Sequence, residues 1–287
     1  MLLLEWQRSY RRNGLGNQLF LYASLLGIAS RNHLHPIMPS YSPVIKVFTL
    51  GGKDLRIADP EAYDTLVCKG RSLPQPEIYS AFCCTYFSFT EKLKNHVEND
   101  VVLHGAFQSW KYFHPEYSAE IKQSLKFRAD IILEADTILE NITKDLHSDT
   151  ELVGIHVRRG DILRTHLRQF GHVPAPGSYF QRSREYLDSR HTSLFYVVVT
   201  NDVPWAKEAI SGLNAVVLEK VKPEVALALL TKMKHLIIST GTFSWWAAYL
   251  SDAVEVLYFN GTPTPLSFYD ITFRAEDYYL PNWKGLS

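Results

Sequence analysis

The stretch Glu151-Leu-Val-Gly-Ile-His-Val-Arg-Arg-Gly-Asp161 decides the fold, because it predicts a buried strand that runs directly into a polar loop. Successive side chains of a strand point to opposite faces of its sheet. We therefore expect His156 and Arg158 on one face and Val157 and Arg159 on the other. At the end of this strand we therefore expect one arginine side chain on each face of the sheet.

The two arginines at this strand end form a suitable site for a diphosphate. Guanidinium groups bind phosphate oxygens through paired hydrogen bonds and stay charged at every relevant pH. In a transfer from a nucleotide sugar the departing diphosphate gains negative charge, so a fixed arginine at this strand end would stabilise the transition state more than the ground state. A surface salt bridge between Arg159 and Asp161 is the simpler alternative, and these residues alone leave it open.

The C-terminal half predicts an α/β fold, because short β-rich runs alternate with helix-like segments. The expected strands are Leu152 to Val157, Leu194 to Thr200, Ala215 to Leu218, Leu236 to Ser239 and Val254 to Phe259, and the expected helices are Ser178 to Ser189, Pro204 to Ser211, Pro223 to Lys234 and Phe243 to Ser251. Such alternation is typical of a parallel sheet covered on both faces, which binds ligands at the carboxyl ends of its strands.

The first half is less regular. Gly14 to Ser30 reads as a glycine turn entering a helix, and a loop region with several prolines follows from Pro36 to Pro76. Tyr117 to Leu146 predicts one long amphipathic helix or two shorter ones. We therefore expect two domains, an N-terminal α/β domain over residues 1–147 and a C-terminal Rossmann-type domain over residues 148–287.

Composition sets limits on the class of protein. Hydrophobic residues make up 46% and charged residues 21% of the 287, as in an ordinary globular protein. The formal net charge is zero, whereas a nucleic-acid binder would show a basic excess, so we expect no nucleic-acid partner. The three cysteines form no Cys-x-x-Cys pair, so we expect no structural zinc site. The apolar run from Leu19 to Ala29 is about half the ~20 residues that a membrane span needs.

Two further segments carry polar residues after a predicted strand. In Leu236 to Leu250 the strand leads into Thr240-Gly-Thr242 and then a helix beginning near Phe243, whose N-terminus and hydroxyls suit an anion. A plain helix cap at Thr242 is the alternative, and the following tryptophans favour core packing. In Thr200-Asn-Asp202 a carboxylate could accept hydrogen bonds from guanine; otherwise Asp202 is a turn residue.

Together these segments resemble the α-1,2-fucosyltransferase family, the galactoside fucosyltransferases of glycosyltransferase family 11. The similar motifs, in chain order, are Gly14-Leu-Gly-Asn-Gln-Leu-Phe20 with Tyr22-Ala23, Gly105-Ala-Phe-Gln-Ser109 with Tyr112-Phe113, His156-Val-Arg-Arg-Gly-Asp161, Thr200-Asn-Asp202 with Trp205 and Lys207, and Thr240-Gly-Thr-Phe-Ser-Trp-Trp-Ala-Ala-Tyr-Leu250. The family usually has a strand directly before the first motif, where this chain instead has Arg8, Arg11 and Arg12.

The resemblance implies a GT-B-like architecture of two Rossmann-type halves, with GDP-fucose bound mainly by the C-terminal half and no metal required. Arg158 would hold the β-phosphate with His156 beside it, and Asp202 would read guanine. The donor-binding residues that we expect are Gly16, Asn17, His156, Arg158, Arg159, Asp202, Thr240, Thr242, Phe243 and Ser244. The sequence has no Asp-x-Asp triplet, which agrees with metal-independent transfer.

The expected reaction is an inverting transfer of L-fucose to the 2-hydroxyl of a terminal β-galactoside on a glycan. Asp161 is the candidate general base alongside Arg158 as the catalytic cation, with His166 and His172 as alternatives for the base. Two other functions stay open: a non-catalytic GDP-sugar or glycan-binding protein on the same scaffold, and a fucosyltransferase acting on protein or core glycan. We expect acceptor selectivity in the loops 36–76 and 164–176.

The cellular compartment that we expect depends on the organism from which the protein comes. A eukaryotic protein would be a Golgi enzyme whose membrane anchor is not in this sequence, and a bacterial one would be cytoplasmic. Two sequons, Asn141-Ile-Thr and Asn260-Gly-Thr, are compatible with a secretory route. The sequence predicts no oligomeric state.

Overall fold

The structure is a computed structural model, and it describes residues 1–4, 14–51, 54–72, 84–88, 93 and 100–287. The chain divides into two compact units. The first comprises residues 1–128 and 271–280, and the second comprises residues 129–270 and 281–287. The three arginines before the first glycine motif lie outside the described residues.

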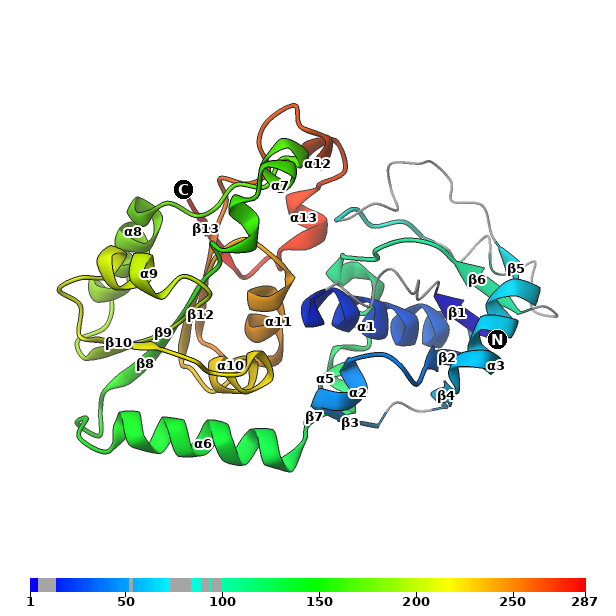
Figure 1. Ribbon diagram of the computed structural model, residues 1–287, viewed down its shortest axis with the longest axis horizontal. Coiled ribbons are helices and arrows are strands. Elements are labelled where there is room, and N and C mark those ends of the chain that lie inside the picture. Colours follow the sequence, from blue (N-terminus) through cyan, green and yellow to red (C-terminus); the bar gives the residue numbers. More distant parts are fainter. Residues whose placement is uncertain (5–13, 52–53, 73–83, 89–92, 94–99) are drawn as a thin grey trace. The chain divides into compact units, whose positions relative to one another are not determined.

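The second unit is built on a parallel sheet in the Rossmann order (Figure 1). Its strands are β8 (Glu151–Val157), β9 (Leu194–Thr200), β10 (Ala215–Leu218), β11 (His235–Ile238), β12 (Glu255–Phe259) and β13 (Lys284–Leu286). The spatial order is β10-β9-β8-β11-β12-β13, and each neighbouring pair is parallel. The chain starts in the middle of the sheet and extends first to one edge and then to the other. Strand order therefore reverses between β8 and β11.

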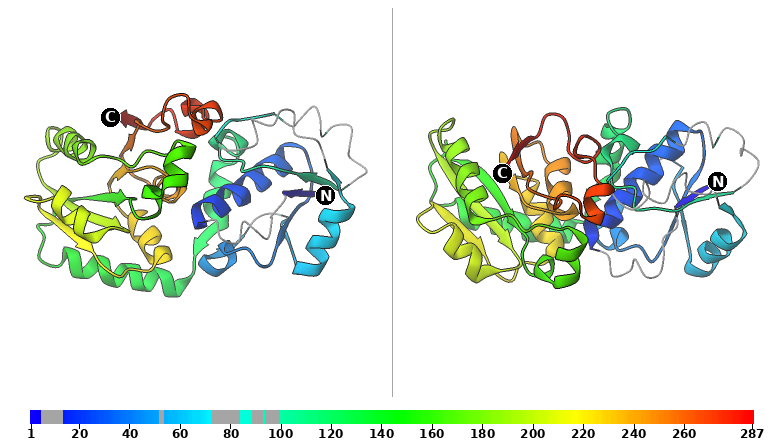
Figure 2. Two further views of the ribbon diagram at one scale, coloured as in Figure 1. Left: turned by 45° about the horizontal axis from the view of Figure 1, so that its top comes forward. Right: turned by 90° about the horizontal axis from the view of Figure 1, so that it is seen from above.

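Helices cover both faces of this sheet (Figure 1 and Figure 2). Helices α8 (Gly177–Asp188) and α9 (Val203–Ala209) lie on one face, where Ile155 packs in the core cluster with Tyr179 and Ala206. Helices α6 (Ala129–Thr143), α10 (Pro223–Leu230) and α11 (Thr242–Leu250) belong to the other face. A Cβ added at Gly154 would meet Leu230 and Met233 there, so this glycine lets α10 approach the strand.

The first unit has its own parallel sheet, in the order β4-β2-β1-β6-β5. These strands are β1 (Leu2–Leu4), β2 (Pro36–Pro39), β4 (Arg56–Ala58), β5 (Arg71–Ser72) and β6 (Val101–Leu103). A short antiparallel pair joins β3 (Phe48–Leu50) to β7 (Leu125–Phe127). Helix α1 (Leu15–Arg31) is buried along most of its length because apolar residues occupy most of its circumference. The described residues of this unit also form short helices: α2 (Val44–Val47), α3 (Pro60–Lys69), η2 (Trp110–Tyr112), α5 (Ser118–Ser124) and α13 (Ala275–Tyr278).

The predicted α/β class with parallel sheets in both halves is confirmed. The region from Pro36 to Pro76 was expected to be loop, and its described residues instead form strands and helices. Tyr117 to Leu146 forms two helices, α5 and α6, with strand β7 between them. The expected domain boundary after residue 147 and the observed division after residue 128 differ by α6, whose residues Glu134 and Asp136 pair with lysines of the second unit. No helix within the described residues combines the length and hydropathy that crossing a bilayer requires.

Candidate functional site

The candidate site lies at the carboxyl ends of β8 and β11 in the second unit. These strands are neighbours in the sheet, with Ile238 opposite His156, although they are far apart in the sequence. Helices α8 and α11, which lead back from these strands to β9 and β12, cover opposite faces. In open parallel sheets a crevice forms where strand order reverses in this way, and ligands bind there.

Arg158 is the central cation of this crevice. Its backbone N–H donates to the Ser239 hydroxyl at 3.0 Å, which ties the end of β8 to the end of β11. Its side chain donates to both oxygens of Asp161, with Nε···Oδ1 at 3.1 Å and Nη2···Oδ2 at 2.6 Å. This fork keeps the guanidinium in one orientation and lowers the pKa of the Asp161 carboxyl.

Gly241 gives the Arg158 guanidinium its space. The residue has φ +115°, a conformation that favours glycine, and a Cβ added there would overlap the Arg158 Nη1 atom. Gly241 is also the N-cap of α11, and no side chain caps this helix. The guanidinium therefore lies directly against the backbone at the start of α11, where the helix dipole favours an anion.

His156 is buried beside Arg158 on the same face of the sheet. Its ring lies 5.0 Å from the ring of Phe243, and its Nδ1 atom is 3.5 Å from the Ser239 hydroxyl oxygen. Burial, together with the charge of Arg158, lowers the pKa of His156 to about 3. At neutral pH this imidazole is uncharged, so it can contribute a hydrogen bond but no positive charge to the site.

Arg159 points to the opposite face, which confirms the alternation expected at this strand end. Its guanidinium lies 4.1 Å from the ring centre of Trp205, and its Nε atom is 3.4 Å from Asp202 Oδ2. Its backbone N–H and that of Gly160 both donate to the Asn201 side-chain oxygen, at 2.8 and 3.1 Å. The salt bridge between Arg159 and Asp161 that we held as the alternative is wrong, because Asp161 pairs with Arg158 and Arg159 pairs with Asp202.

Asp202 caps helix α9, since its Oδ1 atom accepts from the backbone N–H of Trp205 at 3.3 Å. The turn-residue role is thus present. A carboxylate has about four acceptor positions, so the cap and Arg159 leave room for further donors. Recognition of guanine by Asp202 stays a prediction.

The residues around the start of α11 divide into buried and partly exposed ones. The Thr240 hydroxyl donates to the Val173 carbonyl at 2.7 Å, and the Ser244 hydroxyl donates to the Ser239 carbonyl at 3.2 Å. Both hydroxyls therefore hold the local backbone. Thr242 and Phe243 are partly exposed at the first turn, and the cap expected at Thr242 lies instead at Gly241. The tryptophans that follow are fully buried, as expected for core packing.

The two histidines considered as bases differ in environment. His166 is exposed on α7 (Thr165–Phe170). His172 packs its ring 4.6 Å from that of Tyr269, and its Nδ1 atom is buried without a hydrogen-bond partner in the described part of the chain. Burial, and then the positive charge of Arg158, lowers the pKa of His172 to about 4, which makes it a weak base.

Gly16 and Asn17 belong to the first unit, in the first turn of α1. Asn17 accepts a hydrogen bond from the Gln108 side chain at 3.2 Å. Two of the motifs noticed in the sequence, around residues 14–20 and 105–113, are therefore in contact with each other. Contact of Gly16 or Asn17 with a donor sugar stays a prediction.

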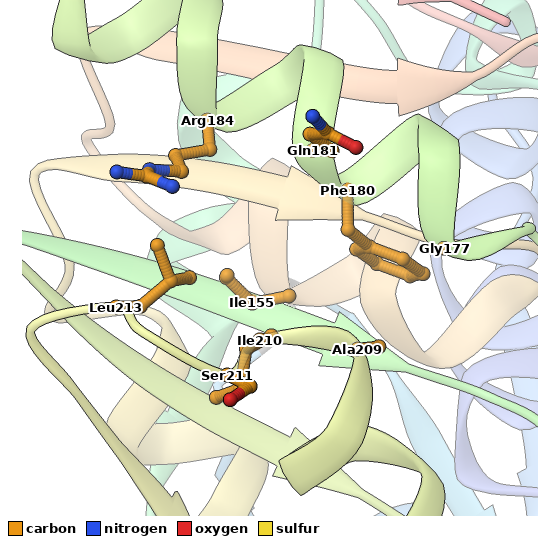
Figure 3. A pocket seen from close by; sticks show the side chains of 9 residues that line it. All are labelled: Ile155, Gly177, Phe180, Gln181, Arg184, Ala209, Ile210, Ser211 and Leu213. Atoms are coloured by element: carbon orange, nitrogen blue, oxygen red, sulfur yellow. The ribbon is translucent and has the colours of Figure 1, made fainter.

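A cavity of about 270 Å³ opens elsewhere in the second unit, between α8 and α9 (Figure 3). Its lining includes Phe180, Gln181 and Arg184 of α8, together with Ile210 and Leu213 beyond the opposite helix. None of the predicted site residues lines it. The candidate donor site at the carboxyl ends of β8 and β11 is therefore separate from this cavity.

The model of glycosyl transferase family 11 matches residues 86–287, which include the whole crevice. The chain belongs to glycosyltransferase family 11. Relatives of this family 11 chain include the galactoside 2-alpha-L-fucosyltransferase SEC1 of Bos taurus, 29% identical over 281 residues that cover 95% of this chain and 72% of the relative. Another is the galactoside alpha-(1,2)-fucosyltransferase 2 of Bos taurus, 28% identical over 95% of this chain and 76% of the relative.

Solved structures support the GT-B-like fold of this family 11 chain. The NodZ α-1,6-fucosyltransferase co-crystallised with GDP superposes with a TM-score of 0.60 over 92% of this chain and 98% of that one, at 15% identity. POFUT1 in complex with GDP-fucose superposes with a TM-score of 0.54 over 90% and 97%, at 14% identity. At these identities the likeness concerns the fold, and the GT-B-like architecture expected from the sequence is confirmed.

Proposed function

We propose that this glycosyltransferase is a galactoside α-1,2-fucosyltransferase, which transfers L-fucose from GDP-fucose to the 2-hydroxyl of a terminal β-galactoside with inversion. The family and the names of its relatives support the reaction class. The observation that carries the proposal for this chain is Arg158, a cation at the switch point of the sheet that Asp161 orients and Gly241 accommodates.

The proposed chemistry is a single displacement. The acceptor hydroxyl releases its proton to solvent water as its oxygen forms a bond to the fucose anomeric carbon, and the bond from that carbon to the β-phosphate oxygen breaks on the opposite side. GDP leaves with the electron pair, and Arg158 with the start of α11 stabilises the negative charge that develops on it. Metal-independent transfer is part of the proposal, because a fixed guanidinium can supply this charge stabilisation.

We assign Asp161 a positioning role in place of the base role expected from the sequence. Both of its oxygens accept from Arg158, and its pKa is lowered, so it is a poor proton acceptor in this arrangement. The neutral His156 would donate or accept one hydrogen bond beside the diphosphate. Attack by the hydroxyl then depends mainly on its position and on stabilisation of the leaving group.

A donor and acceptor screen tests the proposal. Calorimetry with GDP-fucose, GDP-mannose and UDP-sugars should show that GDP-fucose binds with a much lower Kd than the other donors, or that it alone binds. GDP release should rise on adding lactose and not on adding its 2-deoxygalactose analogue, and NMR of the product should show an α-1,2 linkage. The transfer should persist in a chelator.

The alternatives predict different outcomes of the same screen. Donor binding with no release under any acceptor would indicate a non-catalytic binding protein. Release with a peptide or core glycan, and none with lactose, would indicate a fucosyltransferase of the other class. A Golgi location remains a prediction that depends on the source of the chain.

A further inference from the structure

A cluster of side chains that can bind a metal lies at the amino-terminal ends of β8 and β11, whereas the candidate donor site lies at the carboxyl ends of the same strands. Glu151 is the first residue of β8 and His235 is the first residue of β11, so they begin neighbouring strands. His191 lies in the turn between α8 and β9. At about 3.3 Å per strand residue, the length of β8 separates this cluster from Arg158 by roughly 20 Å.

From this geometry we infer that Glu151, His191 and His235 form a binding site for one zinc-type divalent ion. The Nδ1 atom of His191 and the Nε2 atom of His235 lie 2.8 and 3.0 Å from the same carboxylate oxygen, Oε2 of Glu151. The three candidate ligand atoms lie within 4.8 Å of one another.

The spacing suits a tetrahedral ion. With metal–ligand bonds of about 2.0–2.2 Å, the ligands of a tetrahedral zinc ion are about 3.3 Å apart. To reach this spacing, the distance from each histidine nitrogen to Oε2 of Glu151 must increase by about half an ångström. The distance between the two histidine nitrogens must decrease by about 1.5 Å at most. His191 lies in a turn, which can make this adjustment more easily than the two strand residues.

A second layer of contacts prepares His191 for this role. Its other ring nitrogen, Nε2, lies 3.0 Å from Oε1 of Glu255, the first residue of β12. A histidine that binds a metal through one nitrogen commonly donates the other N–H to a carboxylate, which sets the tautomer and the ring orientation. Arg190 also contacts Glu255, and Lys234 pairs with the other oxygen of Glu151, so Oε2 faces the two imidazoles.

The donor set identifies the class of ion. Two imidazoles and one carboxylate suit zinc and similar first-row ions, whereas Mg²⁺ and Ca²⁺ prefer sets made of oxygen atoms. The expectation of no zinc site rested on cysteine spacing, and this set contains no cysteine. An ion here would join the beginnings of β8 and β11 to the turn before β9, so its effect would be on stability.

Zinc uptake by the whole protein tests the inference. The protein is stripped with a chelator, dialysed and titrated with Zn²⁺ against a chromogenic competitor, with Co²⁺ absorption reporting the geometry. We expect one tight equivalent, a tetrahedral Co²⁺ spectrum and a rise in the unfolding midpoint of about 5 °C at 100-fold excess over Kd, with no such rise in Mg²⁺. Absence of a tight equivalent in the wild-type protein would overturn the site.

Variants locate the ion. His191→Ala should weaken the tight equivalent about 100-fold, while His147→Ala, which removes an exposed histidine that also pairs with a carboxylate, should leave it unchanged. Glu255→Gln keeps all three ligands and should weaken zinc about 10-fold, which serves if His191→Ala fails to fold. Wild-type affinity in both His191→Ala and Glu255→Gln would show that the zinc binds elsewhere.

Discussion

Arg158 and Asp161 form a two-point pair, in which the Nε and Nη2 atoms of the arginine donate to separate oxygens of the carboxylate. They are three positions apart in the sequence, and the turn at Gly160 brings them together. The pair presents the remaining guanidinium nitrogen, Nη1, to the backbone at Gly241. The orientation of one arginine thus depends on the residues at the ends of two strands.

Removing the cation should abolish transfer and leave the fold intact. Arg158→Ala is expected to lower kcat/KM by about 10³-fold, because a charge-stabilising donor at the leaving group is lost. Arg184→Ala removes an arginine from a comparable pair with Asp188 on α8 and should change kcat/KM less than about 2-fold. Steady-state kinetics with circular dichroism measure both. Turnover near the wild-type rate in Arg158→Ala would remove this residue from the donor site.

A side chain at residue 241 should displace Arg158. Gly241→Ala is expected to lower kcat/KM about 100-fold and to cost about 1–2 kcal/mol of unfolding free energy for the positive φ. Gly212→Ala is the matched control, since Gly212 also has positive φ, at +80°, but has open space around it. Both variants should lose stability in urea titrations, and only the first should lose activity. Equal activity losses would refute a specific contact with Arg158.

Asp161→Asn distinguishes positioning from base catalysis. If Asp161 orients Arg158, kcat/KM should fall about 10-fold, mostly through kcat, and the shape of the pH profile should match that of the wild type. The lowered pKa of Asp161 means that the carboxylate is ionised throughout the neutral range and that its stabilising effect is lost only as pH falls below the ordinary Asp range. Disappearance of an acid limb in Asp161→Asn would identify Asp161 as the base.

Burial of the neutral His156 should make stability depend on pH. The unfolded chain binds a proton at this residue below about pH 6.5, whereas the folded chain does so only near pH 3, so acidification favours unfolding. Between pH 7 and pH 5 this contributes a loss of about 2 kcal/mol. Urea titrations of His156→Gln should show a correspondingly smaller loss. The exposed His166→Gln should keep the wild-type dependence, and an unchanged loss in His156→Gln would contradict a buried neutral imidazole.

The sequence predicted most strands of the second unit because they are runs rich in aliphatic and β-branched residues that alternate with helical segments; it missed β13 (Lys284–Leu286), which has no such composition. Leu194 to Thr200 and Ala215 to Leu218 are observed as expected. The described strands of the first unit's parallel sheet span two to four residues, such as Leu2–Leu4, and are too short for a periodic pattern to identify. Their stability comes from pairing with segments distant in the sequence.

Part of the site followed from local sequence and part did not. Two arginines after a predicted strand favoured an anion site without excluding a surface ion pair, and Arg158 is found at the switch point of the sheet. The partner of each arginine could not be predicted from the sequence. The pairing of Asp161 with Arg158 and of Asp202 with Arg159 depends on where the backbone turns. The approach of Gly241 to Arg158 joins strands far apart in the chain, and no local pattern predicts it.

The return of residues 271–280 to the first unit has a consequence for dissecting the enzyme. Tyr278 is buried there and stacks with Phe20, and the Asp277 carboxylate pairs with Lys111. No single peptide bond therefore separates the polypeptide into two self-sufficient fragments. A recombinant piece beginning at residue 129 would carry these apolar side chains without the surroundings that bury them, so a split or chimeric enzyme would need the 271–280 segment exchanged together with the first 128 residues.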